Sequence, residues 1–504
     1  MKSVKDLVKH SSIYGIGQIV SRFASVLLLP LYTRCLSTSD YGCVAILDLT
    51  AGILAILIGG GVAQAVVRFH FEDQTENAER RAWWTGFSWV VVCASLIVTP
   101  MILCRGLLAE LTLDPSVGDG AFFYLLAVST LWCNTIASLV ETWLRVRKWS
   151  GVFVVVSFGR LLLNIGLNVW FLVGLDMGVE GLLIGNLIAA ALNMLVLVSI
   201  FAKTLRGFLF DSALLRRQLG FGSPLIVTAL LSLLMHEADR YFLKHYAGLS
   251  EVGVYSLAYK IGQAVNMLFL IPFSAIWNVV MYEMADEPEP QKNYARVYEY
   301  FTYALLILTL AASLFAYPLL PLLTPGEYSQ AVDLIPIILL AYMLYAMHQQ
   351  FSVPALLAKR TAALIPVSIA GVVVNVVLNL LLVPRFGAAG AAWSSVATYG
   401  TFSFVGLYRY RSFDRYPYPF ARLLGVSIGV AMTYLVVRFL VLPGLSLPTQ
   451  LLVAGLATTA WCGILLKPVM NPILEIVADK LGGQLGERIR RRIRRTKTEP
   501  AAAT

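Results

Sequence analysis

Three basic side chains interrupt long apolar stretches of this 504-residue sequence. Arg22, Arg160 and Lys260 each stand inside a different stretch, with apolar residues on both sides. A charge at the centre of a membrane span costs roughly 2.5–3.5 kcal/mol on insertion scales, so it usually faces a cavity or a partner. Together these cations could line a central cavity that suits an anionic substrate, such as a pyrophosphate.

Uncharged polar residues accompany the cations at helical spacing. Gln18 precedes Arg22 by four residues, Gln263 follows Lys260 by three, and Asn164 follows Arg160 by four. A further stretch carries Asn375. Intramembrane asparagines either contact ligands or join neighbouring helices, and the pattern leaves both interpretations open. We assign four of these residues to the polar lining of the cavity: Gln18, Gln263, Asn164 and Asn375.

Acidic residues are the natural counterparts of these cations. Asp48, Glu237 and Asp239 lie in or at the ends of apolar stretches. They could pair with the cations when the site is empty, or bind a coupling proton or sodium ion. Two structural alternatives stay open: Arg22 could form a purely structural pair with Asp48 or Asp239, and Asp239 with Arg240 could cap the end of a span.

The sequence holds no pattern typical of catalysis or of metal binding. It contains neither a phosphate-binding loop of the G-x-x-x-x-G-K-[ST] type nor an H-E-x-x-H pair. The six cysteines have no metal-type spacing and are expected to be small core residues. We therefore expect no enzyme activity, no cofactor and no bound metal.

The elements that position these residues are membrane-spanning helices. Hydrophobic residues make up 58% of the chain and charged residues only 13%, against about 25% charged in soluble domains. Apolar runs of this length and continuity indicate helices rather than barrel strands. We predict an all-α membrane protein with fourteen spans, at about 12–33, 43–69, 83–104, 121–144, 152–175, 179–202, 222–243, 252–276, 298–323, 331–357, 362–383, 387–408, 421–441 and 449–470.

The distribution of basic residues predicts the orientation of the spans. Lysines and arginines concentrate in alternate loops, which are expected to be cytoplasmic, together with both termini. This bias explains the net charge of +10 without nucleic acid as a partner. The opposite loops are short, with no room for a catalytic domain, and hold only four basic residues: Arg34, Arg105, Lys244 and Arg385.

The chain contains an internal repeat with an offset of 211 residues. Ser39-Asp40-Tyr41-Gly42 matches Ser250-Glu251-Val252-Gly253, and Asn164 and Asn168 match Asn375 and Asn379. Lys148 and Lys359 keep the same offset, and Gly178-x-x-Gly181 matches Gly387-x-x-Gly390 with a shift of two. Several matches at one offset indicate a duplication.

The repeat sets the domain organisation that we expect. Six spans return the chain to the same side of the membrane, so the two copies point the same way, as in transporters that rock two bundles about a central site. We predict a six-helix lobe at 1–202, a second at 203–410, two added spans at 411–470, and a basic amphipathic cytoplasmic tail at 471–504.

Several motifs resemble those of bacterial polysaccharide flippases. They are Ser12-Ile-Tyr-Gly-Ile-Gly-Gln, Pro30-Leu-Tyr-Thr-Arg-Cys-Leu-Ser, Asp40-Tyr-Gly, Gly222-Ser-Pro, Asp239-Arg-Tyr-Phe-Leu and Val252-Gly-Val-Tyr-Ser-Leu-Ala-Tyr-Lys-Ile-Gly. The chain is similar to oligosaccharide flippases of the superfamily that includes multidrug and toxin extrusion transporters and lipid II flippases. The resemblance extends to the last span.

The resemblance implies both a function and partners. It implies a fourteen-helix fold of two lobes in the bacterial inner membrane. It also implies translocation of an undecaprenyl-pyrophosphate-linked oligosaccharide to the outer leaflet, for O-antigen, capsule or exopolysaccharide. Arg22 and Lys260 correspond by position to cavity cations of the family. Membrane lipid, a polysaccharide polymerase and a chain-length protein are the other expected partners.

Two functions of the same fold, and one of a different class, compete with this interpretation. A multidrug-type exporter of cations would be expected to carry net acidic cavity residues, whereas the deepest charges here are basic. A lipid II flippase would use the same fold. A polysaccharide polymerase or ligase would need a large outer loop, and the predicted outer loops are short.

Overall fold

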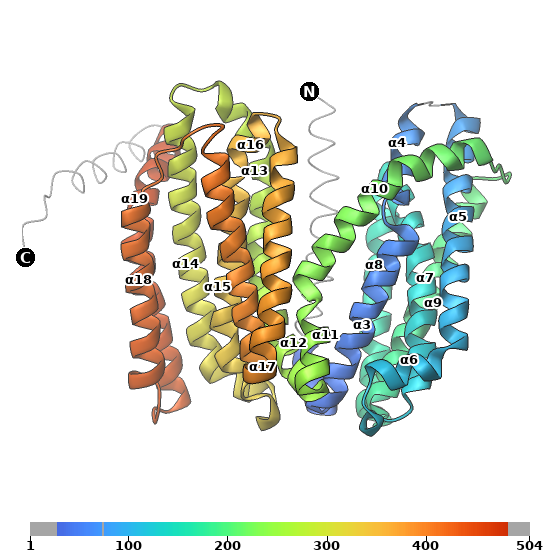
Figure 1. Cartoon of the computed structure of the whole chain (residues 1–504), viewed down its shortest axis with the longest axis horizontal. Helices are drawn as coiled ribbons and strands as arrows, with labels where there is room; N and C mark the ends of the chain where they lie inside the picture. The colour runs from blue at the N-terminus through green and yellow to red at the C-terminus, as the bar shows by residue number, and fades with distance from the viewer. Residues whose placement is uncertain (1–27, 73–74, 482–504) are drawn as a thin grey trace, which may run out of the picture. The chain divides into compact units, whose positions relative to one another are not determined.

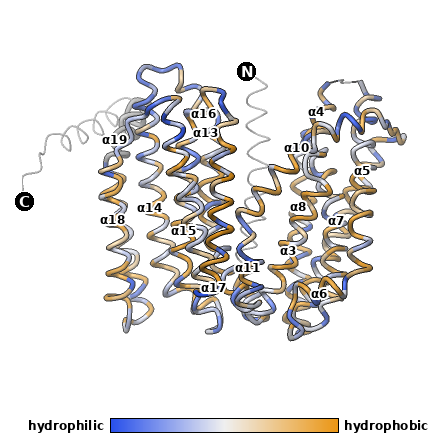
Figure 2. The backbone as a smooth tube through the Cα atoms, viewed as in Figure 1, coloured by the Kyte–Doolittle hydropathy of each residue, from blue (hydrophilic) through white to orange (hydrophobic). Residues whose placement is uncertain are grey.

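The chain folds entirely into helices and their connections over the residues described by the computed structural model, 28–72 and 75–481. Twelve helices in these residues are long and apolar enough to cross a membrane. Their bodies are predominantly hydrophobic, and hydrophilic residues gather at their ends (Figure 2). The predicted fold class is confirmed. Each predicted span from 43–69 onward overlaps one of the twelve helices, with 362–383 and 387–408 sharing one, whereas 12–33 lies mostly outside the described residues.

The first eleven described helices run in order along the first half of the chain (Figure 1). They are α2 (Leu29–Cys35), α3 (Thr38–Gly59), α4 (Val62–Glu72), α5 (Glu76–Leu103), α6 (Arg105–Thr112), α7 (Gly120–Val146), α8 (Ser150–Val169), α9 (Gly178–Thr204), α10 (Ser212–Glu237), α11 (Asp239–Ala247) and α12 (Leu249–Val265).

The second half of the chain contributes seven more helices. They are α13 (Ile271–Glu283), α14 (Pro290–Leu323), α15 (Ala331–Phe351), α16 (Val353–Leu357), α17 (Leu364–Tyr410), α18 (Phe420–Val436) and α19 (Leu447–Leu481). The strongly basic part of the predicted tail, beyond Leu481, lies outside the described residues.

Contacts divide the chain into two compact units. The first unit comprises the described residues through Ile271, together with Pro321–Ala341 and Ser368–Thr401. The second comprises Pro272–Leu320, Tyr342–Val367 and the described residues from Phe402. The predicted lobe boundaries at 202 and 410 stay predictions.

The sequence repeat is also present in the backbone. Lys148 and Lys359, which are 211 residues apart, both have φ of 57° just after a helix ends. Such left-handed residues are uncommon unless they are glycines, and they typically end helices. Gly178 (φ 55°) and Gly387 (φ 52°) form a second matched pair, and Gly387 breaks α17 into two helices. Matching backbone irregularities at matching positions support the duplication.

The repeated acidic residue has different roles in the two copies. Asp40 belongs to a capping box, in which Asp40 N donates to Ser37 Oγ (3.1 Å) and Ser37 N donates to Asp40 Oδ2 (3.1 Å). Two otherwise unpaired N–H groups at the start of α3 are thereby satisfied. Its counterpart Glu251 instead accepts a hydrogen bond from Ala388 N (2.9 Å) at the break in α17.

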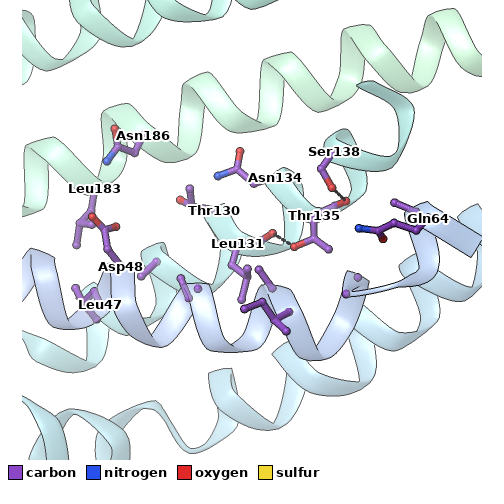
Figure 3. A pocket seen from close by; sticks show the side chains of 18 residues that line it. Leu47, Asp48, Gln64, Thr130, Leu131, Asn134, Thr135, Ser138, Leu183 and Asn186 are labelled. Atoms are coloured by element: carbon purple, nitrogen blue, oxygen red, sulfur yellow. Dashed lines mark hydrogen bonds between the residues drawn. The ribbon is translucent and has the colours of Figure 1, made fainter. Parts of the chain in front are cut away.

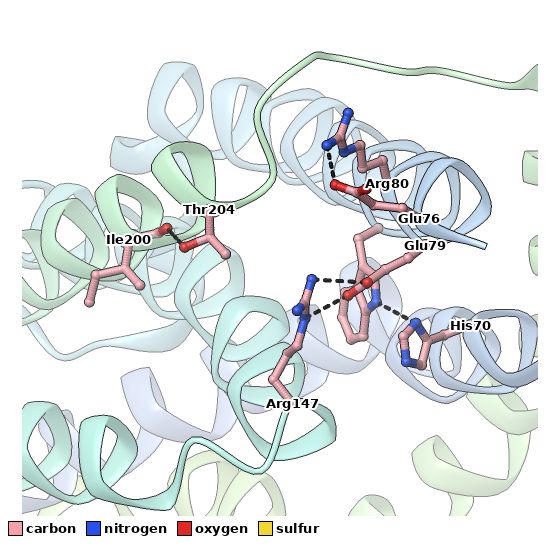
Figure 4. A network of polar contacts seen from close by, with 8 residues as sticks. His70, Glu76, Glu79, Arg80, Arg147, Ile200 and Thr204 are labelled. Carbon is pink, nitrogen blue, oxygen red and sulfur yellow. Dashed lines mark hydrogen bonds and ion pairs between the residues drawn. The ribbon is translucent and has the colours of Figure 1, made fainter. Parts of the chain in front are cut away.

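A polar network ties α5 to α7 near the loop that follows α7 (Figure 4). Arg147 donates from Nε and Nη2 to the two carboxylate oxygens of Glu79, at 2.8 and 2.9 Å. The neighbouring Trp83 donates from Nε1 to His70 Nδ1 (3.4 Å) on α4. A bidentate arginine–carboxylate pair constrains both distance and angle, so it fixes how these helices meet.

Candidate functional site

A polar cavity of about 420 Å³ lies in the first unit, between helices of the first and second sequence repeats. Its volume is in the range of small-molecule binding sites, roughly 300–1,000 Å³. Helices α2, α3 and α9 provide one part of the lining, and α10, α11 and α12 provide the other. The lining includes four predicted site residues: Asp48, Glu237, Lys260 and Gln263.

A second cavity, of about 540 Å³, adjoins the first along α3. The two share Asp48, Gly52 and Asn186 as lining residues. Figure 3 shows Asp48 and Gln64 on α3 and α4, with Asn134 and Asn186 on α7 and α9. Polar groups therefore continue along α3 from one cavity into the other.

Lys260 is the described cation of the first cavity that is not paired with a carboxylate. Its Nζ is 3.4 Å from the hydroxyl of Tyr41 and 5.8 Å from the ring centroids of both Tyr32 and Tyr41. Within the described residues no carboxylate oxygen lies within 4.0 Å of Nζ. Aromatic rings stabilise an ammonium group without neutralising it. Lys260 thus forms no close ion pair within the described residues, although the Asp48 carboxylate of the same cavity acts on it at longer range.

Arg240 is a cavity residue that the sequence analysis did not assign to the site. It forms an ion pair with Glu237, donates from Nε to Ser256 Oγ (3.1 Å), and lies 5.1 Å from the ring centroid of Tyr259. Its own counterion therefore neutralises it. The described lining has two cations and two carboxylates, so any excess of positive charge depends on Arg22, which lies outside the described residues with Gln18.

Asp239 is enclosed by four neutral hydrogen-bond donors. The carboxylate is only 1% exposed. Oδ2 accepts from Ser395 Oγ (2.7 Å) and Tyr255 Oη (2.9 Å), and Oδ1 accepts from Asn379 Nδ2 (2.7 Å) and Asn375 Nδ2 (3.2 Å). Such a set of donors stabilises a buried charge without a cation. The described partners of Asp239 are thus neutral side chains, and its pairing with a membrane cation stays a prediction.

The two asparagine pairs of the repeat both join helices. Asn164 donates to Asn186 Oδ1 (2.8 Å), and Asn168 donates to the Tyr32 hydroxyl (2.9 Å). Asn375, the counterpart of Asn164, is only 2% exposed and donates to Asp239 instead. Neither Asn164 nor Asn375 lines the two cavities. Their direct contact with a ligand stays a prediction.

Arg160 points towards α7 rather than into either cavity. Its Nη2 donates to Asn134 Oδ1 (2.8 Å), and its Nη1 lies 3.9 Å from Glu141 Oε1. Arg160 is absent from the lining of both cavities, whereas Asn134 lines the larger one. The arginine can therefore orient a lining residue, and its own role in binding stays a prediction.

Helices α3 and α12 cross at the two glycines of the repeated motif. A Cβ atom on Gly42 would lie 1.9 Å from the Leu249 carbonyl oxygen, and one on Gly253 would lie 1.9 Å from that of Thr38. The Thr38 and Ser250 hydroxyls are 2.8 Å apart across the same contact. Only glycine allows backbones to approach this closely. The repeated motif therefore marks a direct backbone contact between the two repeats, beside the cavity.

A family model described as polysaccharide biosynthesis protein matches residues 7–278, more than half of the chain. The chain belongs to this family. No curated protein shows significant sequence similarity to it.

Three solved structures of transporters share the fold. The lipid II flippase MurJ, in an inward closed conformation, has a TM-score of 0.70 at 12% identity, covering 92% of this chain and 100% of MurJ. An inward-facing multidrug resistance MATE family transporter of the MOP superfamily has a TM-score of 0.62 at 15% identity, covering 80% of this chain and 96% of the transporter. A MOP superfamily transporter from Pyrococcus furiosus, described as having a binding pocket of reverse polarity, has a TM-score of 0.53 at 15% identity. The match covers 80% of this chain and 95% of that transporter.

Proposed function

We propose that this protein flips an undecaprenyl-pyrophosphate-linked oligosaccharide from the cytoplasmic to the outer leaflet of the inner membrane, for O-antigen, capsule or exopolysaccharide synthesis. The observation that carries the proposal is the cavity between the repeats, in which Lys260 contacts the Tyr41 hydroxyl and forms no close ion pair with a described residue, in a member of a polysaccharide biosynthesis family. Membrane topology with both termini in the cytoplasm is part of the proposal.

The chemistry around Lys260 suits a phosphate group. An ammonium group and tyrosine hydroxyls are donors, and phosphate oxygens are strong acceptors. Tyr41 is within reach of the same ligand because its hydroxyl is 3.4 Å from Lys260 Nζ. Arg22 is the second cation that we assign to the site. Gln263 and Asn186, which also line the cavity, offer amides to sugar hydroxyls.

The contact between the repeats supports a mechanism of alternating access. Gly42 and Gly253 hold α3 and α12 together next to the cavity, at the end of these helices that the charge bias places outside. Substrate would enter from the cytoplasmic side while this contact is closed, and leave after the two helices separate. The prenyl tail would stay in the lipid. Asp239 is our candidate for binding the coupling proton or sodium ion.

A deletion strain tests the transport step directly. We expect it to accumulate the undecaprenyl-linked oligosaccharide on the inner leaflet and to lack surface polysaccharide. Wild-type protein should restore export, whereas Lys260→Ala and Arg22→Ala should not, although both reach the membrane. Lys244→Ala is the matched control, since Lys244 lies on α11 near Asp114 (3.9 Å) and does not line the cavity.

The phenotype of the same deletion strain distinguishes the proposed function from its two alternatives. Accumulation of lipid II instead of the oligosaccharide would identify a lipid II flippase, and sensitivity to cationic drugs with normal polysaccharide would identify a multidrug-type exporter. Outer-leaflet oligosaccharide in the deletion strain, without a paralogue, would refute the transport proposal. Normal export by both Lys260→Ala and Arg22→Ala would refute the binding site. A polymerase and a chain-length protein are the partners that we propose to use the exported product.

A further inference from the structure

The loop that joins α17 to α18 closes a separate cavity of about 290 Å³ in the second unit. Both helices are long and apolar enough to cross a membrane, the first ending at Tyr410 and the second beginning at Phe420. The loop between them must therefore lie at a membrane surface, where the headgroups of lipids are found. None of the residues that line the two cavities of the first unit lines this one.

Two unpaired arginines line this cavity. Arg411 and Arg415 are exposed, and neither guanidinium lies within 4.0 Å of a carboxylate in the part of the chain that is described. The acidic residue of the same loop, Asp414, also lines the cavity, and both of its carboxylate oxygens accept hydrogen bonds. Its Oδ2 accepts from Gln291 Nε2 (3.2 Å) and its Oδ1 accepts from Arg415 N (2.8 Å). The lining is therefore net positive.

Most of the remaining lining is an aromatic wall formed by Phe351, Tyr410, Tyr416, Tyr418 and Phe420. The Tyr418 ring centroid is 5.4 Å from that of Phe351, 5.5 Å from that of Phe420 and 5.8 Å from that of Tyr416. Tyr416 is stacked on Tyr294 at 5.0 Å and belongs to a buried hydrophobic cluster. These rings are held by their neighbours, so the wall exists before any ligand binds.

Two tyrosine hydroxyls in the lining lack a partner. The hydroxyls of Tyr410 and Tyr416 are buried and form no hydrogen bond with any described residue. Burial, with the nearby Asp414 carboxylate, raises the pKa of Tyr416 above its ordinary value, so this hydroxyl keeps its proton. A buried hydroxyl without a partner costs free energy. A ligand with acceptor oxygens, after a small shift of the rings, would offer such a partner.

We propose that this cavity binds the phosphate of a membrane lipid, with Arg411 and Arg415 on the phosphate oxygens and the aromatic wall against the glycerol or first methylene groups. The volume accommodates a headgroup, whereas acyl chains would remain in the bilayer. A cationic ligand is disfavoured by the two arginines. The arginine-rich end of this chain, Arg488–Lys497, has the same sign of charge and is disfavoured for that reason.

Binding to the purified full-length protein in detergent tests the proposal. Delipidated protein is titrated with short-chain phosphatidylglycerol, and in parallel with phosphatidylcholine, undecaprenyl phosphate and inorganic phosphate. We expect saturable binding of phosphatidylglycerol. The double variant with Arg411→Gln and Arg415→Gln should lower its affinity roughly tenfold or more, because each basic residue near an anionic lipid adds to the free energy of binding. Arg206→Gln, at another exposed arginine without an ion pair in the described chain, should change affinity less than twofold.

The outcomes separate the sources of phosphate. Tighter binding of undecaprenyl phosphate than of phosphatidylglycerol would assign the cavity to the carrier lipid, and the reverse would assign it to bulk phospholipid; both support a lipid-borne phosphate. If inorganic phosphate binds as tightly as phosphatidylglycerol, the cavity recognises free phosphate and the proposal of a lipid ligand is wrong. Unchanged affinity in the double variant, or equal loss in Arg206→Gln, would overturn the site. Because the assay involves no transport, its result is independent of the proposed flipping.

Discussion

Replacing Gly253 with alanine should loosen the contact between α3 and α12. The new Cβ would lie 1.9 Å from the carbonyl oxygen of Thr38, whereas ordinary contacts begin at 3.4 Å. The two backbones must therefore move apart locally by about 1.5 Å. The nearest atoms belong to backbone, which cannot turn aside as a flexible side chain would.

The cost of this substitution sets the size of the effect. Overpacking of a close contact costs roughly 1–3 kcal/mol, which corresponds to about 5- to 150-fold in an equilibrium constant. If the contact exists only while α3 and α12 are together, Gly253→Ala should raise the population of the separated state by this factor. Gly42→Ala should do the same, because its Cβ would lie 1.9 Å from the Leu249 carbonyl oxygen.

The assay is the labelling rate of a cysteine placed at the contact. Thr38 is only 8% exposed and its hydroxyl lies 2.8 Å from that of Ser250. In a variant whose six native cysteines are replaced by alanine, Thr38→Cys should react slowly with a membrane-impermeant maleimide added to whole cells. Adding Gly253→Ala should accelerate labelling about 5- to 150-fold, since the rate follows the open population.

A matched glycine separates this effect from general damage. Gly166 lies on α8 with nothing within 4 Å of an added Cβ, so Gly166→Ala should leave the labelling rate unchanged. An unchanged rate in Gly253→Ala, at normal protein level, would refute the idea that the two glycines hold the helices together. Equal acceleration in both variants would attribute the change to loosened folding instead.

Three further predictions concern the same unit. A disulfide between Thr38→Cys and Ser250→Cys should stop polysaccharide export, and reductant should restore it; export by the cross-linked protein would contradict alternating access at this contact. Asp239→Ala removes four hydrogen bonds, so at about 0.6 kcal/mol for each membrane hydrogen bond we expect the free energy of unfolding in sodium dodecyl sulfate to fall by about 2–3 kcal/mol. Asn379→Ala, which removes one of the four donors, should lose less, and equal losses would argue against the cage. Glu79→Gln weakens a bidentate pair whose side chains are 13% and 33% exposed, and should cost about 1 kcal/mol, whereas Glu76→Gln, in an exposed pair with Arg80, should cost less in the same measurement.

The sequence predicts the helices and the cavity residues that stand out against an apolar background. Asp48, Glu237, Lys260 and Gln263 do line the cavity, because a polar residue inside a span must face something other than lipid. Tyr32 and Tyr41 also lie at the site but give no comparable signal, since tyrosines near span ends are ordinary anchors at the membrane interface.

Interactions between distant residues could not be predicted in the same way. Three of the four donors to Asp239 lie 136 to 156 residues later in the chain, and neither hydrophobic periodicity nor charge bias relates such positions. Arg160 lies on the same helical stripe as the asparagines, yet its guanidinium contacts Asn134 and Glu141 of α7 and does not line either cavity. The repeat motif predicts the duplication, but only the structure shows that its glycines touch.

The enclosure of Asp239 also has a consequence for biogenesis. Its donors Asn375, Asn379 and Ser395 are synthesised 136 to 156 residues after it, which at about 5–20 residues per second is a delay of roughly 7–30 s on the ribosome. During that interval these three partners are missing. We therefore expect α10 and α11 to reach their final depth only after α17 has been inserted, so that a ribosome stalled before Asn375 would leave Asp239 accessible to water. Helices α10 and α11 would then be synthesised before α17 but reach their final positions after it.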